Sequence, residues 1–81
     1  MELNDVKSLI ESSGNRLSRV SLYDIGQLRQ MTNVDFIIDR ESGDYHYEVS
    51  IDGINESEIA KKILSNYAWT LNENNKLMIN L

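Results

Sequence analysis

The sequence predicts an α+β domain in which one antiparallel sheet, built from two β-hairpins, carries helices on one face. Apolar and polar residues alternate on both sides of a Ser-Gly turn signal, and again on both sides of an Asn-rich loop, as expected for hairpin strands. Three other segments repeat apolar residues at helical spacing behind polar capping residues. The expected element order is α-α-β-β-α-β-β. With 81 residues, the chain is expected to form a single domain, residues 1–81, around one modest core.

The first helix is expected over about residues 5–13. Asn4 precedes it as the expected N-cap, because a short polar side chain can accept a hydrogen bond from a free backbone amide of the first turn. Val6 and Ile10 follow at helical spacing. Gly14-Asn15 provides the stop signal.

The second helix is expected over residues 22–32. Ser21 and Asp24 have the spacing of a capping box, in which each side chain accepts a hydrogen bond from the other residue's backbone amide. The approach to this helix allows a second interpretation, a strand from Arg16 to Tyr23, because the apolar residues there do not form a wide helical stripe. The sequence leaves these two alternatives open.

The first hairpin is expected over Val34–Ile51 around the turn Ser42-Gly43. Its register separates an apolar face from a polar face, and a slip of one residue would mix the two. The pairs expected on the apolar face are Arg40 with Tyr45, Ile38 with Tyr47, Phe36 with Val49, and Val34 with Ile51. The pairs expected on the polar face are Asp39 with His46, Ile37 with Glu48, and Asp35 with Ser50.

The third helix is expected to begin after Asn55 and to end near Asn66. Asn55 is its expected N-cap, and Glu58 closes a capping box. Ile54 and Ile59 hold the two positions of a hydrophobic staple, which fixes the direction in which the chain enters a helix. The side chains expected on its apolar face are Ile59, Ala60, Ile63, Leu64 and Tyr67.

The second hairpin is expected around a three-residue loop, Glu73-Asn74-Asn75, because shorter loops would misalign the apolar residues of its two strands. Such a loop needs a left-handed backbone at its last residue, which Asn75 tolerates. The expected pairs are Leu71 with Leu77, Trp69 with Ile79, and Tyr67 with Leu81. The two hairpins together are expected to join one sheet whose apolar face packs against helices.

The net charge of −5 is concentrated in the middle of the chain. Residues 33–58 contain eight acidic residues against Arg40 alone, which gives −7, whereas residues 1–32 are neutral and residues 59–81 carry +2. Such a block repels nucleic acid phosphates and attracts a basic protein surface. The residues expected to bind a partner are Asp35, Asp39, Glu41, Asp44, Glu48 and Asp52. The alternative is an ordinary solvated face of an acidic protein.

Composition excludes several classes of site. The chain has no cysteine, which excludes thiol nucleophiles, disulfides and thiolate zinc sites. No apolar run approaches the ~18 residues that a membrane span needs, and the N-terminus lacks the regions of a signal peptide. Abundant Asn and Ile are compatible with a low-GC bacterial or phage source. We therefore expect a protein of the bacterial cytoplasm with no membrane partner.

The sequence also offers no set of residues for catalysis. His46 is the only histidine, and four residues of extended strand place Ser50 ~13 Å from it, too far for proton transfer. A surface contact between His46 and Asp39 is expected instead. The run Asp39–Asp44 lacks the glycine that calcium-binding loops carry at their sixth position. We expect no enzymatic activity, no metal and no cofactor.

One short segment points to DNA. Tyr23–Leu28, followed by Thr32–Val34, is similar to the first helix and turn of MerR-type winged-helix regulators. The resemblance implies a DNA-binding function. Its basic groups would be Arg16, Arg19 and Arg29. The recognition helix of such a protein would have to follow over Asp35–Glu41, which is acidic and alternates like a strand, whereas DNA binding needs a basic face.

The acidic block carries a second resemblance. The run Ile37–Ser50 with its central turn leads into Asn55–Ile59 and Ile63–Tyr67, and the chain starts with Asn4-Asp5-Val6. Over about half of the chain, this arrangement resembles small acidic type II-A anti-CRISPR proteins of phage origin. The resemblance implies an inhibitor that imitates DNA and blocks the DNA site of a CRISPR effector. The C-terminal hairpin is neutral here, whereas that group is strongly acidic in this part.

The hypothesis that follows is a small, acidic, non-catalytic protein-binding module. In its sharper form it is a phage-type inhibitor that binds a basic, nucleic-acid-binding protein by charge mimicry and binds no nucleic acid itself. Two alternatives stay open. One is a winged-helix-like DNA-binding regulator, and the other is a homo-oligomer that self-associates through exposed strand edges.

Overall fold

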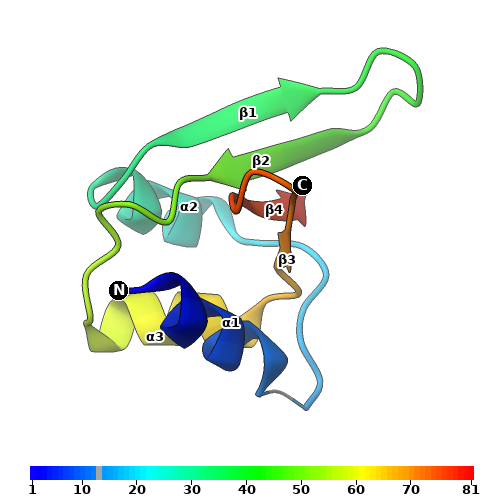
Figure 1. Ribbon diagram of the computed structural model, residues 1–81. Helices are drawn as coiled ribbons and strands as arrows, with labels where there is room; N and C mark the ends of the chain where they lie inside the picture. The colour runs from blue at the N-terminus through cyan, green and yellow to red at the C-terminus, as the bar shows by residue number, and fades with distance from the viewer. Residues whose placement is uncertain (13) are drawn as a thin grey trace.

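The computed structural model describes residues 1–12 and 14–81, and in this part of the chain it contains three helices and four strands (Figure 1). The helices are α1 (Leu3–Glu11), α2 (Leu22–Arg29) and α3 (Glu58–Asn66). The strands are β1 (Val34–Ile38), β2 (Tyr45–Val49), β3 (Thr70–Leu71) and β4 (Leu77–Asn80). The predicted element order is confirmed.

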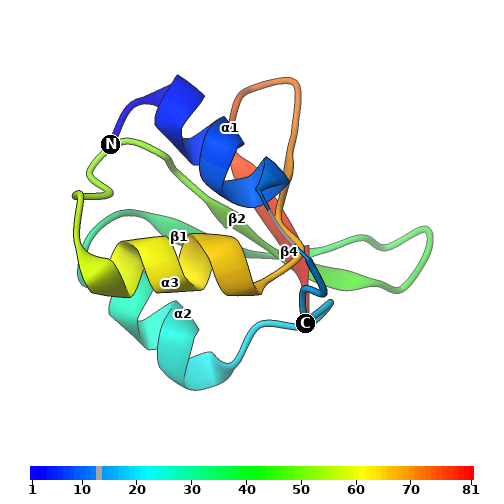
Figure 2. The ribbon, with the colours of Figure 1, turned by 90° about the horizontal axis from the view of Figure 1, so that it is seen from below.

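The four strands form one antiparallel sheet in the order β1-β2-β4-β3. The two hairpins therefore join through β2 and β4, where Tyr47 lies opposite Ile79 and Val49 opposite Leu77. All three helices lie on one face of this sheet, as Figure 1 shows from the side and Figure 2 from below. The predicted α+β architecture is confirmed.

The core lies between the helices and the covered part of the sheet. Val6 and Ile10 of α1, Ile25 and Leu28 of α2, and three residues of α3 point into it. The sheet and the segments around it contribute Val20, Tyr47, Val49, Ile54, Tyr67, Trp69, Leu77 and Ile79. Burial of these side chains supplies most of the favourable free energy of folding.

The predicted start and cap of α1 are wrong. The helix begins at Leu3 with Glu2 at the N-cap position, and no side chain caps it. The ammonium group of Met1 donates a hydrogen bond of 2.6 Å to the Ile54 carbonyl, and this contact holds the chain start against the rest of the fold. Asn4 therefore lies inside the first turn. The helix ends at Glu11, and Ser13, the last residue of the predicted range, lies outside the described residues.

Half of the predicted capping box of α2 is confirmed, because the Ser21 hydroxyl accepts a hydrogen bond of 3.1 Å from the Asp24 amide. The Asp24 carboxylate accepts a hydrogen bond from the Tyr67 hydroxyl, which links α2 to the end of α3. The helix ends at Arg29, three residues before the predicted end at 32. The strand that was considered from Arg16 to Tyr23 does not form. Leu17 and Arg19 each form one isolated parallel bridge, and the helix starts at Leu22.

The first hairpin has the predicted faces, but its predicted register is wrong by two residues. Val34 pairs with Val49, Phe36 with Tyr47, and Ile38 with Tyr45 on the apolar face, while Asp35 pairs with Glu48 and Ile37 with His46 on the other. A shift of two residues keeps every side chain on its face, so the apolar pattern cannot detect it. The register is determined instead by hydrogen bonds within the loop between the two strands.

The predicted cap and staple of α3 are also wrong. Ser57 is the N-cap, and its hydroxyl accepts a hydrogen bond of 3.1 Å from the Ala60 amide. Ile54 is buried, but Ile59 is 49% exposed, so the two do not form a staple. A start at Ser57 turns Ala60, Ile63 and Leu64 to the core and leaves Ile59 at its margin. The predicted end at Asn66 is confirmed.

The second hairpin has the predicted loop and register. Leu71 lies opposite Leu77, and Asn75 has a left-handed backbone with φ 58°. The Asn72 carboxamide oxygen accepts hydrogen bonds of 2.9 Å from the Asn74 and Lys76 amides, which fixes the loop. The predicted pairing of Tyr67 with Leu81 is wrong, because Tyr67 forms a bridge with Leu17 instead.

Candidate protein-binding surface on the first hairpin

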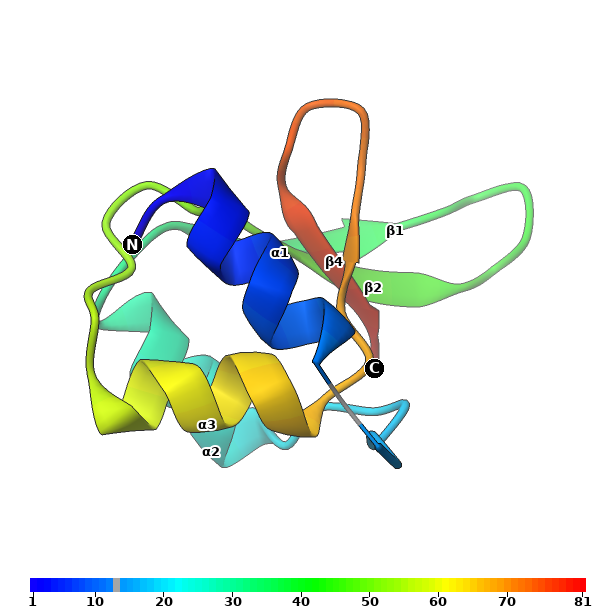
Figure 3. The same ribbon diagram turned by 60° about the horizontal axis from the view of Figure 1, so that its bottom comes forward.

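The far half of the first hairpin extends past the helices. Figures 1 and 3 show the loop between β1 and β2 as the part of the sheet farthest from α1, α2 and α3. The exposed fractions agree, since Phe36 is 47%, Ile38 53% and Tyr45 48% exposed, whereas Tyr47 on the same face is 4% exposed. The helices thus cover only the near half of this hairpin.

The loop at the end of this hairpin is held by the side chain of Asp39. The Asp39 Oδ1 atom accepts hydrogen bonds from the Glu41 amide at 2.9 Å and the Ser42 amide at 3.4 Å. The Asp39 amide donates to the Asp44 carbonyl at 2.9 Å, and the Gly43 amide donates to the Asp39 carbonyl at 2.7 Å. Gly43 has a φ of 75°, a left-handed conformation that glycine adopts without strain. These contacts set the observed register.

The same contacts keep Asp39 ionised. The backbone amide of Glu41, followed by the amide and the hydroxyl of Ser42, lowers the pKa of Asp39 below its ordinary value of 3.8. Hydrogen bonds donated to a carboxylate favour its charged form. Asp39 therefore carries a full negative charge near neutral pH, and the same carboxylate holds the loop through its hydrogen bonds.

The acidic tip, defined as Asp39, Glu41 and Asp44, is exposed and has no compensating ion pair. All three residues are exposed. The ion pairs found among the described residues are His46 with Glu48 and Lys61 with Glu56, and neither involves the tip. Arg40 is the one basic residue of the loop. The tip is thus a fixed loop with a net negative charge that faces solvent.

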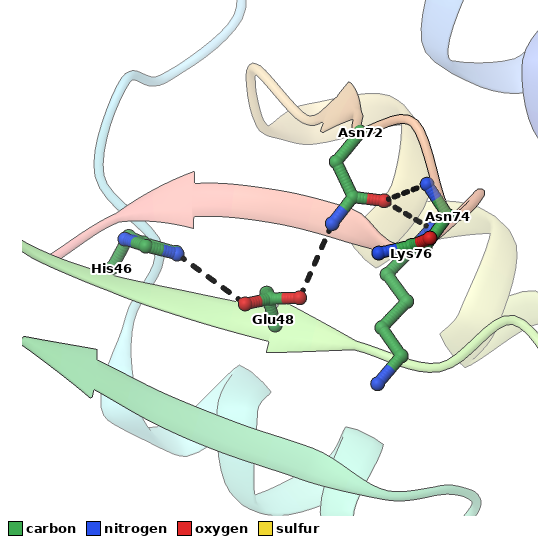
Figure 4. A network of polar contacts seen from close by, with 5 residues as sticks. All are labelled: His46, Glu48, Asn72, Asn74 and Lys76. Carbon is green, nitrogen blue, oxygen red and sulfur yellow. Dashed lines mark hydrogen bonds and ion pairs between the residues drawn. The ribbon is translucent and has the colours of Figure 1, made fainter.

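The predicted partner-binding residue Glu48 lies elsewhere and has another role. It lies on the helix-free face of β2, where Asn72 Nδ2 donates a hydrogen bond of 3.2 Å to its Oε1 atom (Figure 4). His46 Nε2 lies 3.7 Å from its Oε2 atom, and the side chains of His46 and Glu48 are 17% and 22% exposed. Because Asn72 also holds the second loop, Glu48 connects the two hairpins and is less available to a partner.

His46 does not make the contact expected from the sequence. The predicted contact was with Asp39, but the two-residue shift in register places Ile37 opposite His46. Its Nε2 atom lies 3.7 Å from the Glu48 carboxylate, and this buried atom has no hydrogen-bond partner within residues 1–12 and 14–81. The 3.7 Å separation is an ion pair only when the imidazole is protonated.

The last two residues predicted to bind a partner, Asp35 and Asp52, lie away from the tip, the first on β1 and the second beyond β2. Asp35 is exposed on the helix-free face opposite Glu48, and two like charges in such a position repel each other. Asp52 follows the other end of β2, and five strand residues at about 3.3 Å each separate it from the tip by more than ~15 Å. The structure therefore brings together Asp39, Glu41 and Asp44, leaves Asp35 four strand residues or ~13 Å from Asp39, and places Asp52 farther away.

The apolar patch of this hairpin was missed at the sequence level. The rings of Phe36 and Tyr45 stack with centroids 5.7 Å apart, and Phe36 meets Tyr47 edge-on at 5.9 Å. Alternation placed these side chains on the apolar face that was expected to pack against helices, yet Phe36, Ile38 and Tyr45 are each about half exposed. The available signal was their nearness to the turn, since residues beside a long hairpin's tip lie farthest from short helices.

An open cleft of about 310 Å³ lies between residues 43–45 at the end of the first hairpin and Ser18 and Arg19 in the connection between α1 and α2. Its lining includes Arg19, Asp44 and Tyr45 together with the chain end at Leu81. No group of three His, Asp or Glu side chains that could hold a metal ion occurs in residues 1–12 and 14–81. In the same part of the chain, no helix is long and apolar enough to cross a membrane.

Comparison of the chain with protein-family models, with curated proteins and with solved structures gives no match. The interpretation of this surface therefore rests on the sequence and the geometry of the chain itself.

Proposed function

We propose that this chain is a non-catalytic protein-binding module that uses the acidic tip to bind a basic surface on a partner protein. One observation carries the proposal. Three exposed carboxylates occupy a loop that its own hydrogen bonds hold in place, at the end of a hairpin that extends past the helices, and no described residue forms an ion pair with them. A fixed loop loses little conformational entropy on binding.

Charge supports a protein partner over nucleic acid. The block of residues 33–58 carries −7, which repels phosphates and speeds encounter with a basic surface. Such an interaction weakens as salt rises, because screening shortens the range of exposed charges to ~8 Å at physiological ionic strength. Strong salt dependence is therefore an expected property of the complex.

The sharper form of the proposal concerns the class of partner. A surface that carries fixed negative charges and binds no nucleic acid fits proteins whose basic channel normally binds a phosphate backbone. The resemblance to type II-A anti-CRISPR proteins supports this class, with a CRISPR effector as the example. The chain would then act as a phage-type inhibitor that occupies such a channel.

The winged-helix alternative has less support. A recognition helix would have to follow α2, and Val34–Ile38 forms strand β1 at that place. Arg16 is half-buried, so of the three basic residues considered only Arg19 and Arg29 are exposed. Recovery of DNA in the experiment below would favour this alternative.

A pull-down from bacterial lysate with two charge-matched variants tests the proposal. The first variant, Glu41→Lys with Asp44→Lys, reverses two tip charges and keeps Asp39, because Asp39 holds the loop. The control variant, Glu11→Lys with Glu73→Lys, makes the same change in net charge at two exposed positions outside the first hairpin.

We expect the wild type and the control variant to retain a basic partner protein that elutes as salt rises, and the tip variant to lose it. Circular dichroism should show the same fold for all three proteins. Retention of the same partner by the tip variant would contradict the proposal, as would an equal loss from both variants, which would indicate an effect of net charge alone.

A further inference from the structure

Strand β1 has a free edge with unused backbone groups. In the described part of the chain its one strand neighbour is β2. The Ser50 amide donates to the Asn33 carbonyl and the Asp39 amide to the Asp44 carbonyl, so residues 33 and 39 bond across to the β2 side. Because bonding alternates along an antiparallel strand, the amides and carbonyls of Phe36 and Ile38 point away from the sheet.

Apart from the charge of Asp35, this edge lacks the features that usually prevent strand pairing. Natural edge strands are shortened or carry proline, lysine or a bulge. The chain has no proline, β1 contains no lysine, and its five residues pair with β2 in an unbroken register. The opposite edge strand, β3, is only two residues long. The sheet thus leaves one edge open and shortens the other.

Side chains on both faces of this edge define what could pair with it. On the helix side, Phe36 and Ile38 expose apolar surface next to Tyr45. On the helix-free side, Asp35 is exposed and forms no ion pair with any residue that the structure describes. An added strand would direct alternate side chains to these two faces, so it would place apolar residues against Phe36 and Ile38 and a residue near Asp35.

The charge of this edge favours a different chain over a second copy of this protein as its binding partner. Pairing β1 with β1 of another copy would bring two acidic hairpins together and place their Asp35 side chains near each other, and like charges across a strand pair are destabilising. A segment with lysine or arginine at alternate positions would instead meet Asp35 with an opposite charge. The acidic tip would attract the same segment.

We propose that the edge of β1 binds an extended segment of the partner protein, with alternating apolar and basic residues, as a fifth strand of the sheet. This inference rests on the proposed function and specifies how the partner binds. Main-chain hydrogen bonds to Phe36 and Ile38 provide affinity, and alternate side-chain contacts provide specificity, as in other cases of strand addition.

A synthetic peptide of about six residues that alternates Val and Lys is a suitable probe. NMR titration of the full chain should show binding, with slower hydrogen exchange at the Phe36 and Ile38 amides. Two control peptides test the two parts of the proposal. One alternates Val and Glu, and the other is the Val-Lys peptide with alternate amides N-methylated so that one edge cannot form hydrogen bonds. Both should bind more weakly.

The matched protein variants are Ile38→Pro and Ile38→Val. Proline is tolerated on edge strands where the lost amide faces solvent, so Ile38→Pro removes one outward donor and keeps the ladder to β2. Loss of one hydrogen bond should weaken binding of the Val-Lys peptide about five- to tenfold, whereas Ile38→Val keeps this donor and most of the apolar contact and should weaken binding by less. The N-methylated peptide gives the same test without any change in the protein.

Equal binding of the methylated and unmethylated Val-Lys peptides would overturn the inference, and so would equal binding of the Val-Glu peptide. Protection of the Phe36 and Ile38 amides by self-association, without peptide, would also overturn it, because the occupant would then be a second copy. All of these outcomes are measured with Glu41 and Asp44 unchanged. Failure of the tip variant to lose its partner would therefore count against the proposed function separately.

Discussion

The two hairpins of this sheet have similar residues on the same face but very different surroundings. In the second hairpin and its neighbour β2, Ile79 is 3% and Tyr47 4% exposed. In the far half of the first hairpin, Ile38 is 53% and Tyr45 48% exposed. Both regions alternate apolar and polar residues, so their sequence patterns look alike. The difference lies in the helices, which cover one region and leave the other open (Figure 3).

This difference separates residues that stabilise the fold from residues available for binding. A buried isoleucine contributes to stability through the water it excludes and the atoms it contacts. A half-exposed isoleucine and tyrosine on an overhanging hairpin contribute much less to the isolated domain. Exposed apolar residues that cluster beside polar groups are typical of interaction sites. The acidic tip adds charge at the end of the same hairpin.

The largest expected effect comes from a matched pair of substitutions. Ile79→Ala should lower the free energy of unfolding by about 2–5 kcal/mol, because it removes buried methyl groups and leaves a cavity. Ile38→Ala, the same change on the same face of the sheet, should lower it by less than about 1 kcal/mol. Urea denaturation of the two variants beside the wild type measures both values. Equal losses would show that the far half of the first hairpin is part of the core.

A smaller, local effect should distinguish the two loops as the pH falls. Each loop is held by a side-chain oxygen, that of Asp39 in the first hairpin and that of Asn72 in the second. The folded-state pKa of Asp39 is lowered by the backbone amides that donate hydrogen bonds to its carboxylate. Its contribution to stability is therefore present above its ordinary pKa of 3.8 and is lost as the pH falls through the lowered value.

In an NMR titration into acid, the Glu41 and Ser42 amide signals should shift together as Asp39 is protonated. The Asn74 and Lys76 amides should shift less, because they donate to the carboxamide of Asn72, which does not itself titrate. The variant Asp39→Asn should abolish the step at Glu41 and Ser42. Parallel shifts in both loops would indicate general unfolding and would contradict a local role for Asp39.

The sequence predicted the faces of the sheet well, but not the extent to which helices cover them. Alternation assigned each strand residue of the first hairpin to its correct face, since that assignment depends only on a period of two. The same pattern is unchanged when the register shifts by two residues. The register is determined by the Asp39 side chain, which accepts hydrogen bonds from the Glu41 and Ser42 amides. The second loop was predicted correctly because Asn75 satisfies a specific backbone requirement.

The candidate site was predicted only in part, for a related reason. Local sequence placed the acidic tip on a turn, which the structure confirms, but burial of Phe36 and Ile38 depends on contacts with distant elements. The helices have eight or nine residues and are only about 12–14 Å long, so they do not reach the end of the hairpin. The role of Glu48 also depends on Asn72, 24 residues away in the chain, and no local pattern indicates that contact.

The most direct test of the central claim is site-specific photo-crosslinking from the tips of the two hairpins. A photoreactive residue is placed at Ser42 in one variant and at Asn74 in the other, both exposed loop positions, and each protein is irradiated in bacterial lysate at low and at high salt. The account predicts a partner adduct from position 42 that is lost at high salt, and little or no adduct from position 74. Equal adducts from both positions, or an adduct from position 74 alone, would contradict the claim that the first hairpin is the binding element.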